Sequence, residues 1–284
     1  MKLARFMVGT TVGAGVVDGE SIAPLPAGTT LRGLIESGAK GLAWAEEQAQ
    51  RATDHLPLAS VTLLPPVERP GKFLAIGMNY GKHAAEAARL GIAPAAHQLW
   101  FNKQTSCISG PYDPIDPGVT EKLDYEVELG VVIGRAAKHV REEDAADHVF
   151  GYFVANDVSA RDWQFHSPTF TLGKSFDTHG PIGPWLVTPD EIGDPHDLGL
   201  RCFVNGVLRQ SSNTGDMTAN IWQQIAYLST AFTLEPGDLL ATGTPSGVGA
   251  AMDPPQFLQP GDVVRCEIDG IGAIENRVER PVVC

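Results

Sequence analysis

The stretch Leu123–Gly134, LDYEVELGVVIG, constrains the fold of this chain more than any other part of the sequence. Successive side chains point to opposite faces of a strand, so Asp124, Glu126 and Glu128 should share one face and apolar side chains the other. The β-branched run at residues 131–133 then indicates a strand that enters a core. Carboxylates one pleat apart repel each other, and their unpaired burial is strongly unfavourable or forces protonation.

Two interpretations of this acidic face stay open from the stretch alone. It belongs to an exposed edge strand, or it holds a divalent cation, since hard cations take oxygen ligands. A second predicted strand, FGYFVAND, ends at Asp157. If that end lies beside Glu126 and Glu128, the three carboxylates form the kind of oxygen set that binds Mg²⁺ or Mn²⁺.

Composition and charge argue against several classes of protein. The 284 residues carry a formal net charge of −13, whereas nucleic-acid recognition needs a basic surface. No apolar run approaches the length of a membrane span, and the first residues show no convincing secretory cleavage site. Four scattered cysteines without metal-finger spacing predict reduced packing residues in a cytoplasmic protein: Cys107, Cys202, Cys266 and Cys284.

A segment rich in proline and glycine, residues 64–71, is the clearest boundary along the chain. We therefore predict a small N-terminal α/β module over residues 1–68 and a larger domain over residues 69–284. In the module, LARFMV and GAGVVDG have the pattern of short strands, and TTLRGLIES and GLAWAEEQAQRA that of helices. The larger domain should be β-rich, with one hairpin turning at Asn205-Gly206, a pair favoured in type I′ turns.

The segment MNYGKHAAEAARLG is predicted to be a loop followed by a helix. His83 and Glu86 are three residues apart and so share a helix face. A histidine oriented by a carboxylate is the minimum pair for a general base, although a solvated helix face gives the same pattern. Glycines flank the segment, which suggests a lid that orders over a site.

Two further stretches carry polar residues where loops are expected. VSARDWQFHSPTFTLGKSFDTHGPIGPW follows a predicted buried strand, and its Lys174 either binds an anionic substrate or is an ordinary surface lysine. LLATGTPSGVG is glycine-rich but lacks the lysine of a P-loop, which argues against nucleotide binding. Its backbone amides and the Thr244 hydroxyl could hold a carboxylate.

Taken in order, six motifs resemble the fumarylacetoacetate hydrolase family from about Lys72 to the C-terminus. They are AIGMNYGKHAAE, DYEVELGVVIG, NDVSARDWQ, LGKSFDTHGPIGPW, VNGVLRQSSNT and TGTPSGVG. The resemblance implies an α+β, β-rich fold, a mixed β-sandwich roll that is usually a homodimer.

The resemblance also implies roles for individual residues. It assigns Mg²⁺, Mn²⁺ or Ca²⁺ to three carboxylate ligands, Glu126, Glu128 and Asp157. Lys174 matches the lysine near the metal, and Arg161 and Gln164 match the two polar residues after the metal-binding aspartate. Thr244 matches the loop residue associated with the substrate carboxylate, and His83 and Glu86 match the lid dyad.

The function expected from these matches is hydrolysis of a C–C bond in a 2,4-dioxo acid, an acylpyruvate, to pyruvate and a carboxylic acid. His83 would activate water, and Gln164 or Lys174 would stabilise the oxyanion. Decarboxylation of oxaloacetate and isomerisation or hydration of a dienoic 2-oxo acid are the alternatives. A non-catalytic protein that binds metal or a small acid is the alternative from another class. The expected partner is a small 2-oxo acid, with neither nucleic acid nor membrane.

Overall fold

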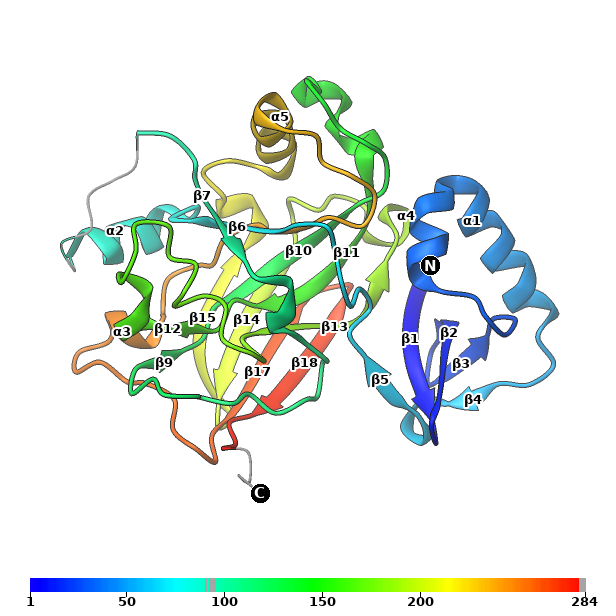
Figure 1. The fold of residues 1–284 in the computed structure, drawn as a ribbon, viewed down its shortest axis with the longest axis horizontal. Helices are drawn as coiled ribbons and strands as arrows, with labels where there is room; N and C mark the ends of the chain where they lie inside the picture. Colours follow the sequence, from blue (N-terminus) through cyan, green and yellow to red (C-terminus); the bar gives the residue numbers. More distant parts are fainter. Residues whose placement is uncertain (90, 92–95, 281–284) are drawn as a thin grey trace.

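The structure, a computed structural model, describes residues 1–89, 91 and 96–280. It is a strand-rich α+β fold with a wide lobe and a small N-terminal lobe (Figure 1). The two lobes share one large mixed sheet, because the first strand of the chain pairs with a strand of the wide lobe. The predicted β-rich sandwich with a small α/β module is confirmed.

The large sheet runs through both lobes. Its strands are β1 (Lys2–Val8), β2 (Thr11–Asp18), β3 (Ser21–Pro24), β4 (Leu56–Pro57), β5 (Thr62–Leu64), β6 (Phe73–Gly77), β7 (Leu99–Lys103), β8 (Ile108–Ser109), β10 (Val127–Ile133), β11 (Val149–Asn156), β13 (Gly180–Val187) and β16 (Leu239–Ala241). Their order is β4-β3-β2-β1-β13-β11-β10-β16-β6-β7, with β5 beside β1 and β8 beside β13. The acidic stretch therefore lies in a central strand rather than at an edge.

A second, antiparallel sheet packs against the wide lobe of the first. Its order is β15-β14-β17-β18, formed by β14 (Gly199–Val204), β15 (Val207–Asn213), β17 (Val263–Ile268) and β18 (Gly272–Arg277). The turn between β14 and β15 has positive φ at Asn205 and Gly206, as a type I′ hairpin requires. A short pair, β9 (Leu123–Asp124) with β12 (Ser159–Ala160), lies beside this sandwich.

Strand β10 shows how the sandwich is filled. Its residues 127, 129, 131 and 133 pack into the core between the two sheets, while Val132 packs into the core on the other face of the large sheet. Glu126 and Glu128 follow the alternation of Val132, on the face away from the second sheet. The period of two predicted for this stretch is confirmed, and both faces of the strand are buried.

Helices and 3₁₀ turns cover the sheets and carry the site loops. They are α1 (Leu31–Arg51), α2 (Gly81–Arg89), α3 (Arg161–Gln164), α4 (Pro189–Ile192), α5 (Ile221–Ala231), η1 (Leu58–Ser60), η2 (Thr105–Cys107), η3 (Glu142–His148), η4 (Thr214–Asp216) and η5 (Gly249–Ala251). Thr30 caps α1 by accepting from Gly33 N at 3.0 Å. Gly38, at φ 56°, kinks α1 between the two helices predicted for this region.

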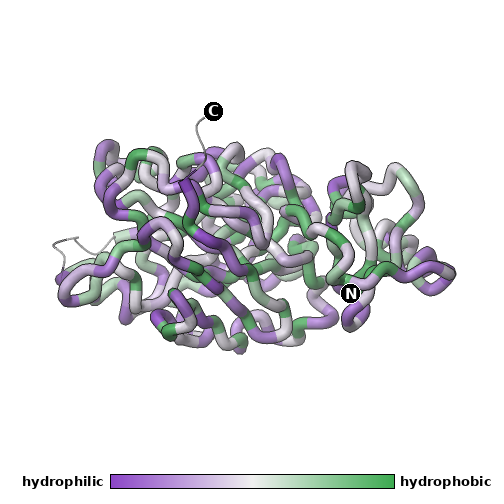
Figure 2. Tube along the Cα trace, turned by 90° about the horizontal axis from the view of Figure 1, so that it is seen from below, coloured by the Kyte–Doolittle hydropathy of each residue, from purple (hydrophilic) through white to green (hydrophobic). Residues whose placement is uncertain are grey.

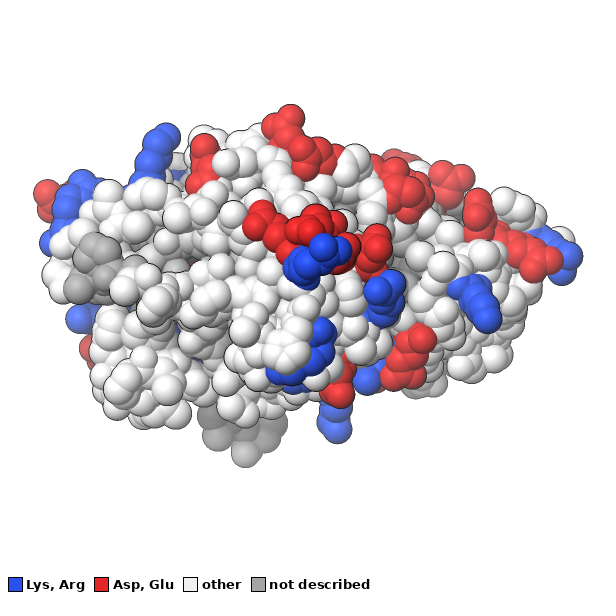
Figure 3. Space-filling model, turned by 90° about the horizontal axis from the view of Figure 1, so that it is seen from above, with Lys and Arg blue, Asp and Glu red and all other residues white. Residues whose placement is uncertain are grey.

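Apolar stretches run through both lobes, and the surface carries the acidic excess (Figures 2 and 3). Acidic side chains gather near the middle of the face in Figure 3, and a broad part of the wide lobe there carries no charge. Cys107, Cys202 and Cys266 are buried free thiols, and Cys284 lies outside the described residues. Among the described helices, none is long and apolar enough to cross a membrane.

Candidate active site and metal centre

The three carboxylates predicted to bind metal meet where β10 begins and β11 ends. These strands are antiparallel with Val127 opposite Asn156, so Glu126 lies opposite Asp157, and Asp157 N donates to Glu126 O at 2.9 Å. Glu128 is two residues further along the same face of β10. One carboxylate oxygen from each side chain lies within 4.8 Å of the other two, and all three residues are buried.

The donor set fits a divalent cation. Two oxygens bound to one cation are at most twice the metal–oxygen distance apart, which is about 4.6–5.2 Å for Ca²⁺ and about 4.0–4.2 Å for Mg²⁺. The three oxygens all lie within 4.8 Å of one another, so they are close enough to share a Ca²⁺ ion and would move closer together around Mg²⁺. Burial, together with the charges of Asp157 and Glu126, raises the pKa of Glu128 well above its ordinary value. Its side chain accepts from Gly243 N at 2.8 Å, and among the described residues no cation forms an ion pair with it. A bound cation would offset the unfavourable burial of the Glu128 charge.

Lys174 is buried and contacts two of the three carboxylates. Its ammonium donates to Glu126 Oε2 and to Asp157 Oδ2, each at 2.7 Å. Burial by itself would raise the pKa of Glu126, but Lys174 and Arg161 outweigh it and hold that pKa below the usual range. The surface-lysine interpretation of Lys174 is wrong, because its residue exposure is 2%.

Arg161, at the start of α3, is held by two carboxylates. Its Nη2 lies 2.6 Å from Glu126 Oε1, and its Nε donates to Asp124 Oδ2 at 2.9 Å. Its Nη1 also donates to Gln164 Oε1 at 3.0 Å. This contact occupies the amide oxygen of Gln164 and leaves its NH₂ group for the cavity that both residues line. Arg161 therefore orients Gln164 in addition to neutralising carboxylates.

Asp124 departs from the expected acidic face. The strand is interrupted after Asp124, and its carboxylate accepts from Gly249 N at 2.7 Å and Ala250 N at 3.0 Å, at the start of η5. It thereby ties the glycine-rich loop to Arg161 instead of joining the triad. The period of two does not predict the direction of the Asp124 side chain, because the strand is interrupted between Asp124 and Val127.

Sequence reasoning missed Lys103, at the end of β7. Its buried ammonium donates to Asp157 Oδ1 at 2.5 Å, to His179 O at 3.0 Å and to Lys174 O. Burial lowers its pKa, but the charge of Asp157 outweighs this and raises it. Both oxygens of Asp157 thus have a lysine donor. The available signal was the alternation in the strand LWFNK, which places Lys103 on the same face as Phe101, and a buried lysine needs a partner.

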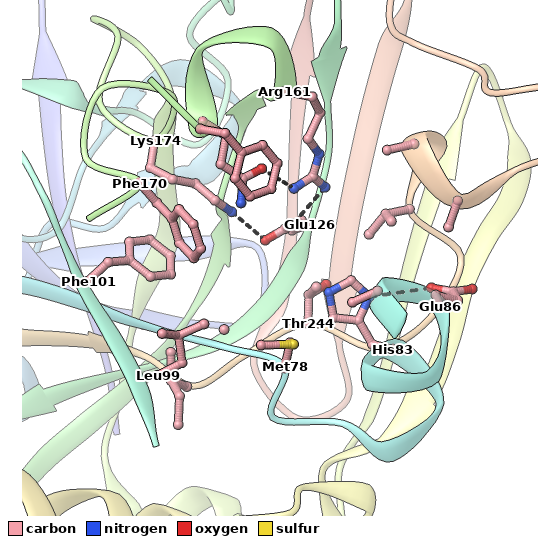
Figure 4. A pocket seen from close by; sticks show the side chains of 18 residues that line it. Met78, His83, Glu86, Leu99, Phe101, Glu126, Arg161, Phe170, Lys174 and Thr244 are labelled. Atoms are coloured by element: carbon pink, nitrogen blue, oxygen red, sulfur yellow. Dashed lines mark hydrogen bonds and ion pairs between the residues drawn. The ribbon is translucent and has the colours of Figure 1, made fainter. Parts of the chain in front are cut away.

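The predicted lid dyad lies on α2, partly buried. His83 Nδ1 is 3.3 Å from Glu86 Oε2, and Gly247 N donates to both oxygens of Glu86 at 3.1 and 3.2 Å. With Nδ1–H directed to Glu86, Nε2 carries the lone pair, and it points away from Glu86 (Figure 4). The solvated-face interpretation is wrong, because α2 packs its polar face against the glycine-rich loop.

Thr244 lies at the cavity, but its hydroxyl is already engaged. It donates to Val127 O at 2.9 Å and accepts from Gln210 Nε2 at 2.8 Å. A hydroxyl has one proton, so in this arrangement it has none to offer a carboxylate. These bonds instead anchor the glycine-rich loop to β10.

A single cavity of about 180 Å³ brings these groups together. His83 and Glu86 lie on one side, Glu126 and Lys174 at the back, and Phe101 with other apolar residues on the opposite side (Figure 4). The full set of polar residues lining it is His83, Glu86, Glu126, Arg161, Gln164, Lys174 and Thr244. Glu128 and Asp157 lie behind this surface, buried next to Glu126.

Comparison with known proteins agrees with this geometry. The model of the fumarylacetoacetate (FAA) hydrolase C-terminal domain matches residues 72–279, and an Rv2993c-like N-terminal model matches residues 1–66. The mitochondrial oxaloacetate tautomerase fahd2 of Xenopus laevis is 44% identical over 290 residues, covering 98% of this chain and 90% of that protein.

Two solved structures resemble the whole chain. A fumarylacetoacetate hydrolase from Exiguobacterium antarcticum has a TM-score of 0.86 at 37% identity, covering 99% of this chain and 100% of the other. Maleylpyruvate hydrolase from Sphingobium sp. SYK-6, in complex with manganese(II) and pyruvate, has a TM-score of 0.82 at 34% identity with the same coverage. The relatives thus include a tautomerase and hydrolases, and this chain belongs to the fumarylacetoacetate hydrolase family.

Proposed function

We propose that this protein is a divalent-metal-dependent enzyme that interconverts the keto and enol forms of a 2-oxo acid by moving a proton at C3. The observation that carries this proposal is the Nε2 of His83, which forms a hydrogen bond to none of the described residues and lies on a cavity that also opens onto Glu126 and Lys174. Removing a proton beside a carbonyl requires a base and stabilisation of the resulting negative charge, and this cavity offers both. The similarity to an oxaloacetate tautomerase along 98% of the chain supports the same chemistry.

The carboxylates Glu126, Glu128 and Asp157 would hold the cation, which we propose to be Mg²⁺ or Mn²⁺, with Ca²⁺ as the alternative. When bound, it would supply Lewis-acid polarisation of the substrate's 2-oxo group. The manganese in the maleylpyruvate hydrolase structure supports a divalent ion of this kind.

The side chains on the cavity have distinct tasks in this proposal. His83 Nε2 takes the proton from C3, and Glu86 stabilises the imidazolium that forms. Lys174 and the NH₂ group of Gln164 donate hydrogen bonds to the oxygens on which negative charge develops. His83 then releases the proton, and the 2-oxo oxygen gains one, so the imidazole is regenerated and the exchange is complete without an oxidant or a reductant.

Hydrolysis of an acylpyruvate is the second candidate. It was the first expectation from the sequence, and the oriented amide of Gln164 favours it, since water attack at C4 creates an oxyanion that needs such a donor. The likeness to maleylpyruvate hydrolase supports it as well. Tautomerisation ranks first because it needs only the proton transfer for which the dyad is arranged.

The test is a set of parallel assays with Mn²⁺ or Mg²⁺ and with chelator. We expect enol formation from 2-oxo acids, followed by ultraviolet absorbance, to exceed the uncatalysed rate only with metal. Pyruvate and a carboxylic acid released from acylpyruvates would favour hydrolysis, and pyruvate with CO₂ from oxaloacetate would favour decarboxylation. Metal binding without any of these reactions would favour the non-catalytic alternative. The homodimer also stays a prediction, which light scattering after size exclusion can check.

A further inference from the structure

The side of the cavity opposite the lid dyad is an apolar wall that contains Leu99, Phe101 and Phe170 (Figure 4), and Phe165, which also lines the cavity, packs on Phe170. The ring centroids of Phe101 and Phe170 are 6.0 Å apart at 68°, and those of Phe165 and Phe170 are 5.5 Å apart at 82°. These are edge-to-face arrangements, which leave ring surface for another planar or apolar group.

Two features of this wall are unusual unless something packs on it. Phe165 lines the cavity and is 57% exposed, although a large aromatic side chain gains stability by being covered. Phe170 has a φ of 60°, a region that bulky residues rarely adopt and that recurs at ligand sites. This backbone conformation holds the Phe170 ring between Phe101 and Phe165.

The charges on the cavity are already paired. Lys174 is bound to Glu126 and Asp157, and Arg161 to Glu126 and Asp124. Among the described residues that line the cavity, there is no further lysine or arginine. Lys174 is the cation nearest the wall, with its ammonium 5.2 Å from the centroid of the Phe101 ring. A second carboxylate on the substrate, placed against the wall, would lose its water and would have to compete with Glu126 and Asp157 for that ammonium.

We propose that this wall is the subsite for the distal part of the substrate and that it takes an uncharged, apolar group. The preferred substrates are then 2-oxo acids that carry an aryl or alkyl group beyond C3, in place of dicarboxylates such as oxaloacetate. This inference rests on the proposed function for the 2-oxo acid head and adds the class of its tail.

Phenylpyruvate and oxaloacetate form a matched pair of probes. Both carry a carboxylate, a 2-oxo group and a C3 methylene, and they differ in a distal phenyl group or a distal carboxylate. In either substrate the C3 proton passes to His83 Nε2 and a proton is added to the 2-oxo oxygen, so the chemistry compared is identical.

The experiment measures kcat/KM for enol formation from each probe with the full-length, Mn²⁺-loaded protein. We expect wild type to favour phenylpyruvate by at least about tenfold. Phe165→Arg places a cation on the wall and should shift the preference toward oxaloacetate by tenfold or more. Leu172→Arg is the matched control, since Leu172 is 50% exposed on the same loop without lining the cavity, and it should leave the preference unchanged.

The outcomes separate this inference from the proposed function. Turnover of oxaloacetate in preference to phenylpyruvate, unaltered in Phe165→Arg, would overturn the apolar subsite while the proposed chemistry stands. Absence of turnover with both probes would overturn the chemistry. In that case the shift in melting temperature caused by each probe decides the subsite: greater stabilisation by phenylpyruvate that Phe165→Arg removes supports it, and any other pattern refutes it.

Discussion

Two parts of the site are built in different ways. We call the carboxylates Glu126, Glu128 and Asp157 with their cationic partners the floor, and the helix α2 with His83 and Glu86 the lid. On the floor, Glu126 and Asp157 each contact two cationic side chains, and the side chains of Glu126 and Asp157 are 6% and 1% exposed. On the lid, the side chains of His83 and Glu86 are 13% and 12% exposed and contact each other at 3.3 Å. A dense buried ion network should affect folding as well as chemistry, whereas a lightly anchored helix should affect the reaction rate alone.

The floor itself holds a second contrast. Glu126 has Lys174 and Arg161 as partners, so its charged form is favoured. Glu128, two residues away, accepts a backbone hydrogen bond and has its pKa raised by burial and by its acidic neighbours. One glutamate thus stabilises the metal-free protein, and the other should destabilise it at neutral pH until a cation binds.

The largest effect is expected from Glu126→Gln. The change leaves the buried cations Lys174 and Arg161 short of a counterion, and breaking a buried ion pair costs about 3–5 kcal/mol. Urea unfolding in the presence of chelator should register that loss, and calorimetry should show that Mn²⁺ affinity falls. A variant as stable as wild type would mean that the floor network contributes to metal binding only.

The lid should behave in the opposite way under His83→Ala. Loss of the general base should lower kcat by about 10²–10⁴. The free energy of unfolding should change by less than about 1 kcal/mol, because the side chain is only partly buried. Titration with Mn²⁺ serves as the control, since the triad should bind the ion normally. Near-normal kcat would remove His83 from the mechanism.

Glu86→Gln separates the two contacts that Glu86 makes. The amide oxygen can still accept from Gly247 N, so the lid should stay in place, but the charge that supports the imidazolium is lost. A hydrogen bond to a charged group is worth about 1.5–3 kcal/mol, which predicts a fall of roughly 10–100-fold in kcat. An unchanged KM would agree with an intact lid, whereas a rise in KM with constant kcat would assign Glu86 to the lid contact alone.

The contrast between floor and lid also shows how far sequence reasoning reaches. The alternation in YEVEL predicted that Glu126 and Glu128 share a face, because side-chain direction in a regular strand is local. The spacing of His83 and Glu86 predicted their contact for the same reason.

The remaining features depend on residues that are far apart in the chain. Lys103 reaches Asp157 across 54 residues, and Asp124 meets Gly249 across 125, contacts that only the sheet order and the loop paths create. The Thr244 hydroxyl looked available for a substrate, since nothing local shows that Gln210 and β10 engage it. Local patterns thus predicted which residues gather, and the partners of each followed from the fold.

The smallest effect, and one of opposite sign, is expected from Glu128→Gln. A neutral amide of the same shape removes the unfavourable burial of a charge, so the metal-free protein should gain on the order of 1–2 kcal/mol at neutral pH. Wild type should gain about 2.7 kcal/mol from Mn²⁺ at 100 times its Kd, and the variant should gain far less. Thermal unfolding with and without chelator measures both.

The stability of the metal-free protein should also depend on pH through Glu128. The pKa of Glu128 in the folded protein is raised above its ordinary value of 4.5. Its protonated form therefore contributes fully to the free energy of unfolding below about pH 4.5, and this contribution is lost as the pH rises through the pKa of the folded protein. Metal-free wild type should therefore weaken above about pH 4.5 in a way that Glu128→Gln does not. Glu126, with its lowered pKa, acts in the opposite direction and at lower pH. If the free energy of unfolding varied with pH in the same way in wild type and Glu128→Gln, burial of the Glu128 charge would not destabilise the metal-free protein. The three carboxylates would then need no cation to offset their burial.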